Sequence, residues 1–503
     1  MRTRLLCCFL AGLGPALSGF ASPAPGPGPV CQTRAGRVQG TRDSTGLLAF
    51  LGLAYAAPPV GAGRFLPPRP LLPWAGVRAA AAFGPRAAQL RGDAPAGAEN
   101  CLTLNVWTPS IRAARRKPVL VWVHGGSFTF GAGDEFPGPR FARHDSLVVV
   151  SLNYRLGSLG FLQLSHLLGP AYRQSGNAGL LDAVAALRWV RANIAAFGSD
   201  PARVTLMGQS AGAKLVAALL VTPTAAGLFQ QVILESGGLQ AVRDTSTAAA
   251  VTARLLSALQ LRPDQAGQLL TLPLTALLRA QQQVAAGPAG LQCFGPVQDG
   301  ATIPPAPVAY LTRPGRPPVR ALMGTNRDEA GFFVDRWPAL RAPNPAVLDT
   351  LFGRNGDHVW RAYERARRTQ PADQAWLRTT TDYLYRLAVY RLAGQLVAAG
   401  QPVWLYRFDY CPPGGPGPVH NQELPYAWNA LGPAAGRSAA ARALARDLHR
   451  RWVAFIATGV PGADWPAYDV KQWRAMVFDS VSRAGPLAPP AEDRAFPRQA
   501  FRL

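Results

Sequence analysis

The feature that most constrains this chain is the pentapeptide Gly208-Gln209-Ser210-Ala211-Gly212. It follows the apolar run 204–207, which has the length of a strand, and it precedes an alanine-rich apolar stretch, residues 213–220, that is typical of a helix. A serine between glycines at a strand-to-helix turn is typical of a nucleophile elbow, where side chains at the flanking positions would clash. The Ser210 hydroxyl would then be exposed at the end of a sheet, and the Ala211 N–H would point toward developing negative charge. Glycine and serine are also common in ordinary turns, so the pattern needs support from elsewhere.

Other apolar runs of strand length follow along the chain, most of them separated by helical stretches. Runs that are apolar on both faces predict strands buried in a parallel sheet. Strands that alternate with helices predict an α/β fold in which one large, mostly parallel sheet is covered by helices on both faces. We expect these strands at residues 102–107, 119–123, 147–152, 204–207, 231–234, 319–323, 403–408 and 475–478.

The remaining segments fit the same architecture. Alternating residues predict an N-terminal hairpin over 32–40 and 45–53, and apolar residues at helical spacing predict a helix over 177–197. The regions 245–285 and 337–400, rich in alanine, leucine and arginine, predict helical insertions that form a cap above the sheet. We therefore expect a single domain over residues 22–503.

The first residues predict an export signal. A basic start, Met1-Arg2-Thr3-Arg4, precedes a short apolar run over residues 5–13, as in secretory signal peptides. We expect a signal peptide over residues 1–21, with cleavage after Ala21 or Ala24, and a secreted or periplasmic mature protein. The apolar run is too short to span a bilayer, and no later segment is long and apolar enough, so we expect no integral membrane association.

The formal net charge of +24 raises the question of an acidic partner. Lysine occurs only at Lys117, Lys214 and Lys471, and arginine supplies the rest, in a chain that is also rich in alanine, glycine and proline. This pattern is typical of a compositional bias in the coding sequence. The longest basic cluster, residues 112–117, has no interleaved aromatic residues, so we expect a solvated loop and no nucleic-acid partner.

Cysteine usage sets limits on disulfides and metals. Removal of the signal leaves Cys31, Cys101, Cys293 and Cys411, which permit two disulfides with three possible connectivities. The sequence contains no C-x-x-C pair, so a structural zinc site is not expected. We expect neither a metal nor a cofactor.

A glycine-rich loop, His124-Gly125-Gly126-Ser127-Phe128, directly follows the expected strand 119–123. At the carboxyl end of a parallel strand, such a loop brings backbone N–H groups close to a ligand without obstruction from side chains. We assign the N–H groups of Gly126 and Ser127, together with that of Ala211, to an oxyanion hole. A plain glycine turn is the alternative for this loop taken alone.

A serine nucleophile needs a base, because its neutral hydroxyl reacts poorly. His420 follows a loop rich in glycine and proline beyond an expected strand, and loops of this kind often carry functional side chains. The other histidines fit less well: His124 belongs to the glycine loop, His144 and His166 precede the serine, and His358 and His449 lie in arginine-rich helical stretches where solvated positions are expected.

The third member must be an acid that orients the histidine and stabilises its charged form. It should lie between Ser210 and His420 at the end of a strand, since the order in this fold is serine, acid, histidine. Asp328 and Glu329 both follow the expected strand 319–323, and the residues alone leave the choice open.

Taken together, these segments resemble the type-B carboxylesterase family, the cholinesterase-related branch of the α/β-hydrolases. The likeness runs from about Val38 to the C-terminus. It rests on residues 99–106, 121–128, 153–157, 176–182, 197–201 leading into the elbow, and 420–426. The acid of that family is usually a glutamate in a loop of this kind, so the resemblance implies Glu329.

The chain also departs from the family pattern. Gln209 stands where glutamate is usual, and Lys214 is unusual on the helix that follows the elbow. The customary disulfide partner of Cys101 is missing near residues 83–88, so Cys101 is expected either to be free or to pair with Cys31. No tryptophan occurs between residues 86 and 100, where cholinesterases keep a choline-binding aromatic residue, so cholinesterase activity is not expected.

The resemblance implies a secreted serine carboxylesterase that hydrolyses small-molecule carboxylic esters through an acyl-enzyme. Ser210, Glu329 and His420 would form the triad, with Gly126, Ser127 and Ala211 as the oxyanion hole. A monomer is favoured. The alternatives are a non-catalytic cholinesterase-like binding protein and an esterase specialised for carbamate, toxin or polyester substrates.

Overall fold

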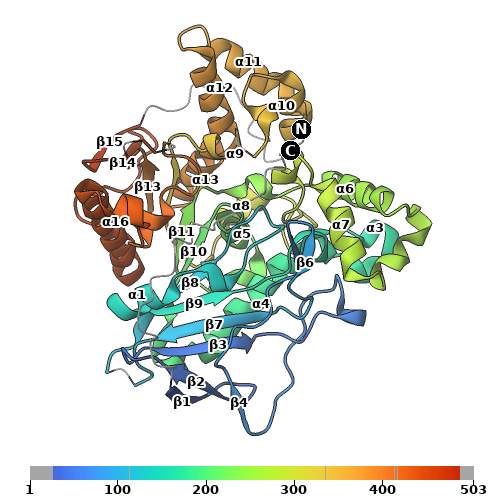
Figure 1. Cartoon of the computed structure of the whole chain (residues 1–503), viewed down its shortest axis with the longest axis vertical. Helices are drawn as coiled ribbons and strands as arrows, with labels where there is room; N and C mark the ends of the chain where they lie inside the picture. The colour runs from blue at the N-terminus through green and yellow to red at the C-terminus, as the bar shows by residue number, and fades with distance from the viewer. Residues whose placement is uncertain (1–25, 113, 335, 413, 416, 488–503) are drawn as a thin grey trace, which may run out of the picture.

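The computed structural model describes residues 26–487 except for 113, 335, 413 and 416. The expected signal peptide therefore lies outside the described residues. Within them, 13 strands form one mixed sheet in the order β1-β2-β3-β7-β9-β8-β10-β11-β12-β13-β14-β15, and β4 pairs with β2 (Figure 1). The bounds of these strands are β1 Gly26–Gln32, β2 Arg37–Arg42, β3 Leu48–Ala54, β4 Val77–Ala79, β7 Thr103–Thr108, β8 Lys117–Val123, β9 Val148–Leu152, β10 Ser199–Gln209, β11 Gln231–Glu235, β12 Arg320–Asn326, β13 Val403–Phe408, β14 Arg474–Phe478 and β15 Arg483–Pro486. A separate small pair consists of β5 Gln89–Arg91 and β6 Ala94–Ala96.

The centre of the sheet is parallel and its edges are antiparallel. From β9 through β14 every neighbouring pair is parallel, whereas β3, β7 and β9 are antiparallel neighbours and β15 runs antiparallel to β14. This confirms the expected α/β-hydrolase fold with a mostly parallel sheet. Because the strands β8, β10, β11, β12 and β13 are parallel neighbours, the loops that follow them share one edge of the sheet.

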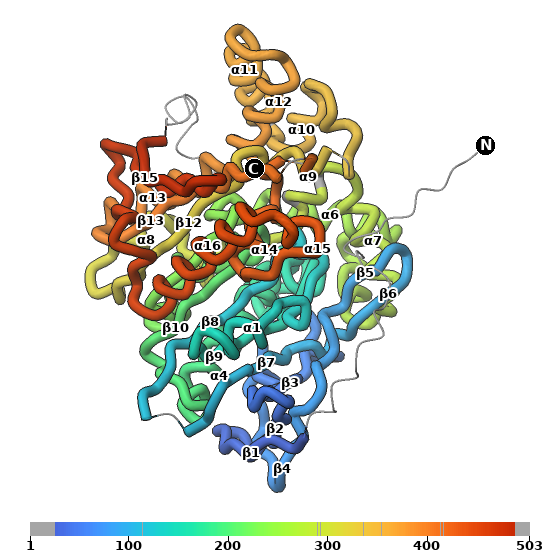
Figure 2. Tube along the Cα trace, turned by 60° about the vertical axis from the view of Figure 1, so that its left-hand side comes forward, coloured from blue at the N-terminus to red at the C-terminus, as the bar shows by residue number. Residues whose placement is uncertain are grey.

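Both faces of the central sheet are buried under helices. Along β10, Leu206 packs into one core and the next residue, Met207, into the other, as the two-residue period of a strand requires. The first core includes residues of α4, α5 and α13, and the second includes residues of α1 and α16, which crosses in front of the strands in Figure 2. The helix bounds are α1 Gly138–His144, α2 Gly157–Phe161, α3 Ser165–Leu168, α4 Ala178–Asn193, α5 Ala211–Leu220, α6 Thr245–Ala258, α7 Leu274–Val284, α8 Pro307–Leu311, α9 Gly331–Val334, α10 Pro345–Phe352, α11 Gly356–Ala366, α12 Ala372–Thr381, α13 Leu387–Ala398, α14 Leu424–Ala427, α15 Pro433–Gly436 and α16 Ala439–Thr458.

The helical insertions lie where they were expected. In Figure 1, α10, α11 and α12 project beyond the carboxyl-end edge of the sheet, and α6 and α7 lie to one side. A third hydrophobic core joins α9 through α12 to the π-helical turn η12, Asp382–Arg386. The end of region 337–400 differs from the expectation, because α13 packs on the sheet and does not belong to the cap.

Several local expectations can be compared with the structure. The N-terminal hairpin is confirmed, although residues 32–40 divide between β1 and β2, so that β2 pairs with β3. Arg112, Arg115 and Arg116 are exposed in the loop before β8, which confirms the solvated loop. The four cysteines are all free thiols: Cys31, Cys101, Cys293 and Cys411. Of the two expectations for Cys101, a free thiol and a disulfide with Cys31, the structure therefore has the free thiol.

The solvated position expected for His449 is wrong. Its side chain is buried, its Nδ1 lies 2.8 Å from the carbonyl oxygen of Ala427, and its Nε2 lies 3.0 Å from Asp145 Oδ2. The reason is that His449 falls on the same stripe of α16 as Ala445 and Trp452, which faces the sheet, while the neighbouring arginine Arg450 is exposed.

Candidate active site

Ser210 occupies a strained turn between β10 and α5. Its backbone angles are φ 55° and ψ −120°, which non-glycine residues rarely adopt. A Cβ on Gly208 would lie 2.6 Å from the carbonyl carbon of Gly212, and a Cβ on Gly212 would collide with the carbonyl oxygen of Val123. The turn is tied to the next strand because Ser210 N–H donates to the Glu235 carbonyl at 2.8 Å. The two glycines are therefore required by close approach of the backbone, as the elbow pattern predicts.

The structure brings His420 and Glu329 together and leaves Asp328 aside. His420 Nδ1 lies 2.5 Å from Glu329 Oε2, and both side chains are buried. Asp328 turns outward and accepts hydrogen bonds from the guanidinium of Arg327 at 3.0 and 3.1 Å. A carboxylate on Nδ1 leaves the lone pair of the neutral ring on Nε2, which is the tautomer that a general base needs.

Glu329 is itself held by two donors that the sequence analysis did not identify. The hydroxyl of Ser236 donates to Glu329 Oε1 at 2.5 Å, and the backbone N–H of Asn326 donates to the same oxygen at 2.8 Å. Ser236 follows β11 directly, at the same sheet edge as Ser210 and at a positive φ of 55°. A polar residue at the end of the strand after the elbow strand is a signal that could have suggested it.

The Nε2 side of the imidazole contacts the elbow through Gln209. Gln209 Nε2 lies 3.2 Å from His420 Nε2, so the side-chain amide caps the basic nitrogen. Ser210 and His420 form no direct hydrogen bond here. The Tyr385 hydroxyl lies within hydrogen-bonding reach of the Ser210 side chain. A rotation of the Gln209 amide would free Nε2 for the adjacent serine.

Three backbone N–H groups are free to receive a ligand oxygen. Gly126 and Ser127 follow β8 at positive φ, 102° and 51°, and a Cβ on Gly126 would collide with the Phe130 carbonyl oxygen. Ala211 begins α5, so its N–H has no partner within the helix. Within the part of the chain that the structure describes, the N–H groups of these three residues donate to no protein group.

Aromatic side chains enclose the imidazole. The ring centroids of Tyr385, Phe333 and Phe332 lie 4.6, 5.3 and 5.8 Å from that of His420. Tyr385 belongs to η12, and Phe332 and Phe333 belong to α9. The cap therefore packs directly on the histidine and shields it from water, which strengthens its interaction with Glu329.

Residues 27–484 match the carboxylesterase family. This chain belongs to that family. Para-nitrobenzyl esterase of Bacillus subtilis (strain 168) is 36% identical over 480 residues, which cover 90% of this chain and 95% of the relative. Phenmedipham hydrolase of Pseudarthrobacter oxydans is 36% identical over 481 residues, with 88% and 93% covered. The crystal structure of the Geobacillus stearothermophilus carboxylesterase EST55 at pH 6.8 superposes with a TM-score of 0.81 at 36% identity, covering 93% of this chain and 99% of that one.

As a carboxylesterase, the protein is a carboxylic ester hydrolase, which argues against the non-catalytic binding alternative. Among the described residues, no group of three or more histidine, cysteine, aspartate or glutamate side chains is arranged to hold a metal ion. The described helices also include none that is both long and apolar enough to cross a bilayer.

Two more buried carboxyl groups lie behind the Glu329 of this carboxylesterase. Burial, followed by the charge of Glu329, raises the pKa of Glu423 to about 8, although a hydrogen bond from the Asn326 side chain opposes the shift. Burial and the nearby Glu423 raise the pKa of Glu235 as well. Both shifts favour the uncharged form of Glu235 and Glu423, so the negative charge gathered behind His420 is smaller than three carboxylates would give.

His124 of the glycine loop is unsuited to act as a base. Burial lowers its pKa to about 4, and its ring stacks on Tyr154 at 4.5 Å between centroids. Its Nδ1 contacts the carbonyl oxygen of Gly125 at 2.9 Å. It therefore remains neutral at ordinary pH and supports the loop that carries Gly126 and Ser127.

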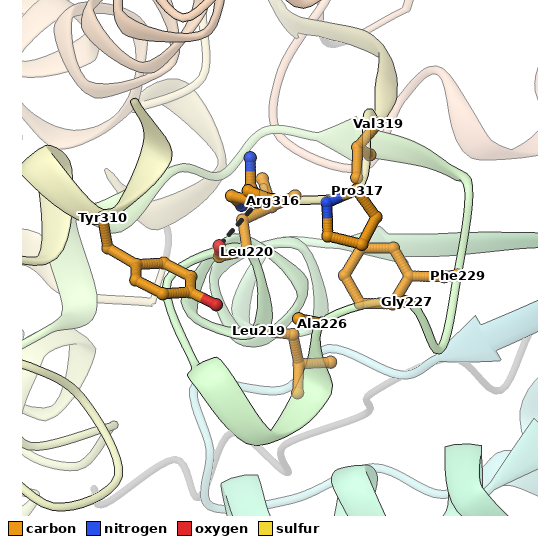
Figure 3. Close-up of a pocket in the computed structure, with 9 residues that line it drawn as sticks. All are labelled: Leu219, Leu220, Ala226, Gly227, Phe229, Tyr310, Arg316, Pro317 and Val319. Carbon is orange, nitrogen blue, oxygen red and sulfur yellow. Dashed lines mark hydrogen bonds between the residues drawn. The ribbon is translucent and has the colours of Figure 1, made fainter. Parts of the chain in front are cut away.

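Two hollows of the carboxylesterase differ in their relation to this site. One cavity has a volume of about 270 Å³, and the cap contributes most of its lining. The lining residues are Ala330 (which follows Glu329), Gly331, Val334, Leu340, Arg341, Asp373, Gln374, Trp376, Leu377, Thr380 and Leu384 (which precedes Tyr385). The other, drawn in Figure 3, has room for about one water molecule at the far end of α5, where Arg316 donates to the Leu220 carbonyl at 2.9 Å. The first cavity is lined by residues next in the chain to Glu329 and Tyr385, and the second by residues remote from them in the chain.

Proposed function

We propose that this protein is an exported serine carboxylesterase that works through an acyl-enzyme on Ser210. His420 acts as general base and then general acid, and Glu329 orients and stabilises its charged form. Gly126, Ser127 and Ala211 supply the oxyanion hole. The observation that carries the proposal is the buried contact of 2.5 Å between His420 Nδ1 and Glu329 beside the strained elbow.

In the first half of the reaction, Gln209 swings off Nε2 and His420 removes the proton of Ser210 as the hydroxyl attacks the ester carbonyl. The carbonyl oxygen becomes an oxyanion, which the three free N–H groups stabilise; one such donor contributes roughly 2.7–4 kcal/mol to lowering the barrier. The alcohol leaves with the proton from His420. In the second half, water loses a proton to His420 and releases the acid from Ser210.

The proposed triad is tested by labelling and by activity. An organophosphonate should label Ser210 stoichiometrically, and Ser210→Ala should lose both labelling and turnover of a short nitrophenyl ester by about 10⁴-fold or more. Asp328→Asn is a matched control, because that carboxylate faces Arg327 and should be dispensable. Labelling at another residue, or turnover by Ser210→Ala at the wild-type rate, would contradict the proposal.

Export and oligomeric state are separate parts of the proposal. Residues 1–21 carry the charge and apolar pattern of a signal peptide, which supports secretion or export to a periplasm. N-terminal sequencing of the mature protein should find a start after residue 21 or 24, and a start at Met1 would contradict export. A monomer is expected in size-exclusion chromatography with light scattering.

A further inference from the structure

Lys214 is a buried cation one helical turn beyond the serine. The residue is 5% exposed, and within the described chain its ammonium forms no hydrogen bond and no ion pair. The nitrogen lies 5.0 Å from the centroid of the Tyr385 ring. It is also one of only three lysines in a chain that otherwise uses arginine.

The surroundings of Lys214 oppose its charge. Burial lowers its pKa to about 8 despite the nearby Glu329. Both oxygens of Glu329 are already engaged, by His420 on one side and by Ser236 and Asn326 on the other. The residue also lies in the first turn of α5, where the helix dipole disfavours a cation. The charge of Glu329 offsets the cost of burial only in part, so a further anion beside the ammonium would stabilise it.

Tyr385 connects this cation to the reacting groups. Its ring contacts the ammonium of Lys214 on the one hand and the imidazole of His420, at 4.6 Å, on the other. Its hydroxyl lies close to Ser210. Lys214 also lies in the first turn of α5, the helix that begins directly after Ser210. The ammonium is therefore within reach of a group carried by an ester bound at Ser210.

Two charge features agree with an anionic ligand. The elbow carries the neutral Gln209 beside His420, so no carboxylate at that position would repel a second anion. The whole chain has a formal net charge of +24, which attracts anions over long range at low salt.

We propose that Lys214 is a specificity-determining residue that binds a carboxylate carried by the ester, so that the preferred substrates are anionic esters such as half-esters of dicarboxylic acids. The inference rests on the proposed role of Ser210. The reaction is still hydrolysis, in which water cleaves the ester to an acid and an alcohol, and Lys214 pairs with the substrate carboxylate without changing its own protonation.

The test compares kcat/KM for three esters by titration of released acid at pH 7 and low salt. Monoethyl adipate carries the anion on the acyl part, the hexanoyl ester of glycolate carries it on the alcohol part, and ethyl hexanoate is neutral. Wild type should favour at least one anionic ester over ethyl hexanoate by tenfold or more, chiefly through a lower KM. The anionic ester that is preferred over ethyl hexanoate shows whether the acyl part or the alcohol part of the substrate faces Lys214.

Variants separate a local contact from the general field of the protein. Lys214→Met should reduce the anionic-to-neutral ratio to about one or below, and Lys214→Arg should keep most of it. Lys471→Met removes one exposed charge away from the site and should leave the ratio unchanged. A ratio that falls equally in both methionine variants would assign the preference to net charge and overturn the proposal.

A second readout needs no variant. The monoamide of adipic acid, which keeps one carboxylate, should protect wild-type Ser210 from organophosphonate labelling at a concentration at least tenfold lower than its uncharged counterpart hexanamide does. If wild type turns over ethyl hexanoate but shows neither preference nor protection, Lys214 does not bind an anion and the serine esterase stands. If Ser210 is not labelled and no ester is hydrolysed, the proposed function itself fails.

Discussion

Replacing Lys214 by methionine should make the protein more stable at neutral pH. Methionine keeps most of the volume and removes the buried charge. The pKa of Lys214 falls from 10.5 to about 8 on folding, and one pKa unit corresponds to about 1.36 kcal/mol. The folded state therefore loses about 3 kcal/mol at pH 7 by holding the protonated lysine, and the variant should regain an amount of this order.

The sign of the pH dependence gives a sharper check. Because the pKa in the folded state is lowered, the penalty is fully present below pH 8 and disappears as the pH rises to 10.5, where the unfolded lysine is also neutral. The gain in the methionine variant should thus shrink from about 3 kcal/mol at pH 7 to less than about half of that at pH 9.5.

Urea unfolding followed by tryptophan fluorescence measures this difference, with Lys471→Met as the control for loss of one positive charge. The slope with urea should be the same in all three proteins, so that the midpoints report stability. A destabilised Lys214→Met, or a gain of equal size at both pH values, would refute the reasoning that the lysine is a buried, uncompensated charge. A stabilised variant that has lost its preference for anionic esters would show that stability is sacrificed for specificity.

Three further substitutions probe the surroundings of the proposed triad. Gln209→Glu places a carboxylate 3.2 Å from the basic nitrogen of His420, so the acid limb of the kcat/KM profile should move up by about one pH unit, and an unmoved limb would contradict the contact. Ser236→Ala removes the hydroxyl that donates to Glu329 and should lower kcat by about tenfold with little change in KM; a change confined to KM would count against a positioning role. The pKa of Glu423 in the folded state is raised to about 8, so this group contributes stability that is present below about pH 4.5 and lost as the pH rises through 8. Glutamine does not titrate, so the urea midpoint of Glu423→Gln should fall less than that of wild type between pH 6 and 9. Parallel midpoints for the two proteins would show that Glu423 does not titrate in this range.

Patterns local in the chain were sufficient for much of the architecture. The strand β10, the helix α5 and the elbow between them could be predicted because apolar spacing and paired glycines report backbone geometry within about ten residues. The loop after β8 and the histidine beyond β13 could be predicted for a related reason, since parallel strands bring their carboxyl ends to one edge. The predicted exposure of His449 was wrong because an arginine-rich composition does not reveal which single stripe of α16 faces the sheet.

The sequence by itself determined the α/β order, the elbow at Ser210 and a short set of candidate partners, because these depend on periodicity and on steric limits of the backbone. Only the tertiary structure decided that Glu329 points inward while Asp328 turns to Arg327, that Ser236 supports the acid, and that Tyr385 joins Lys214 to His420. These residues come from separate strand ends and from a cap turn far along the chain. The directions of their side chains depend on how those segments pack, and no local pattern encodes that packing.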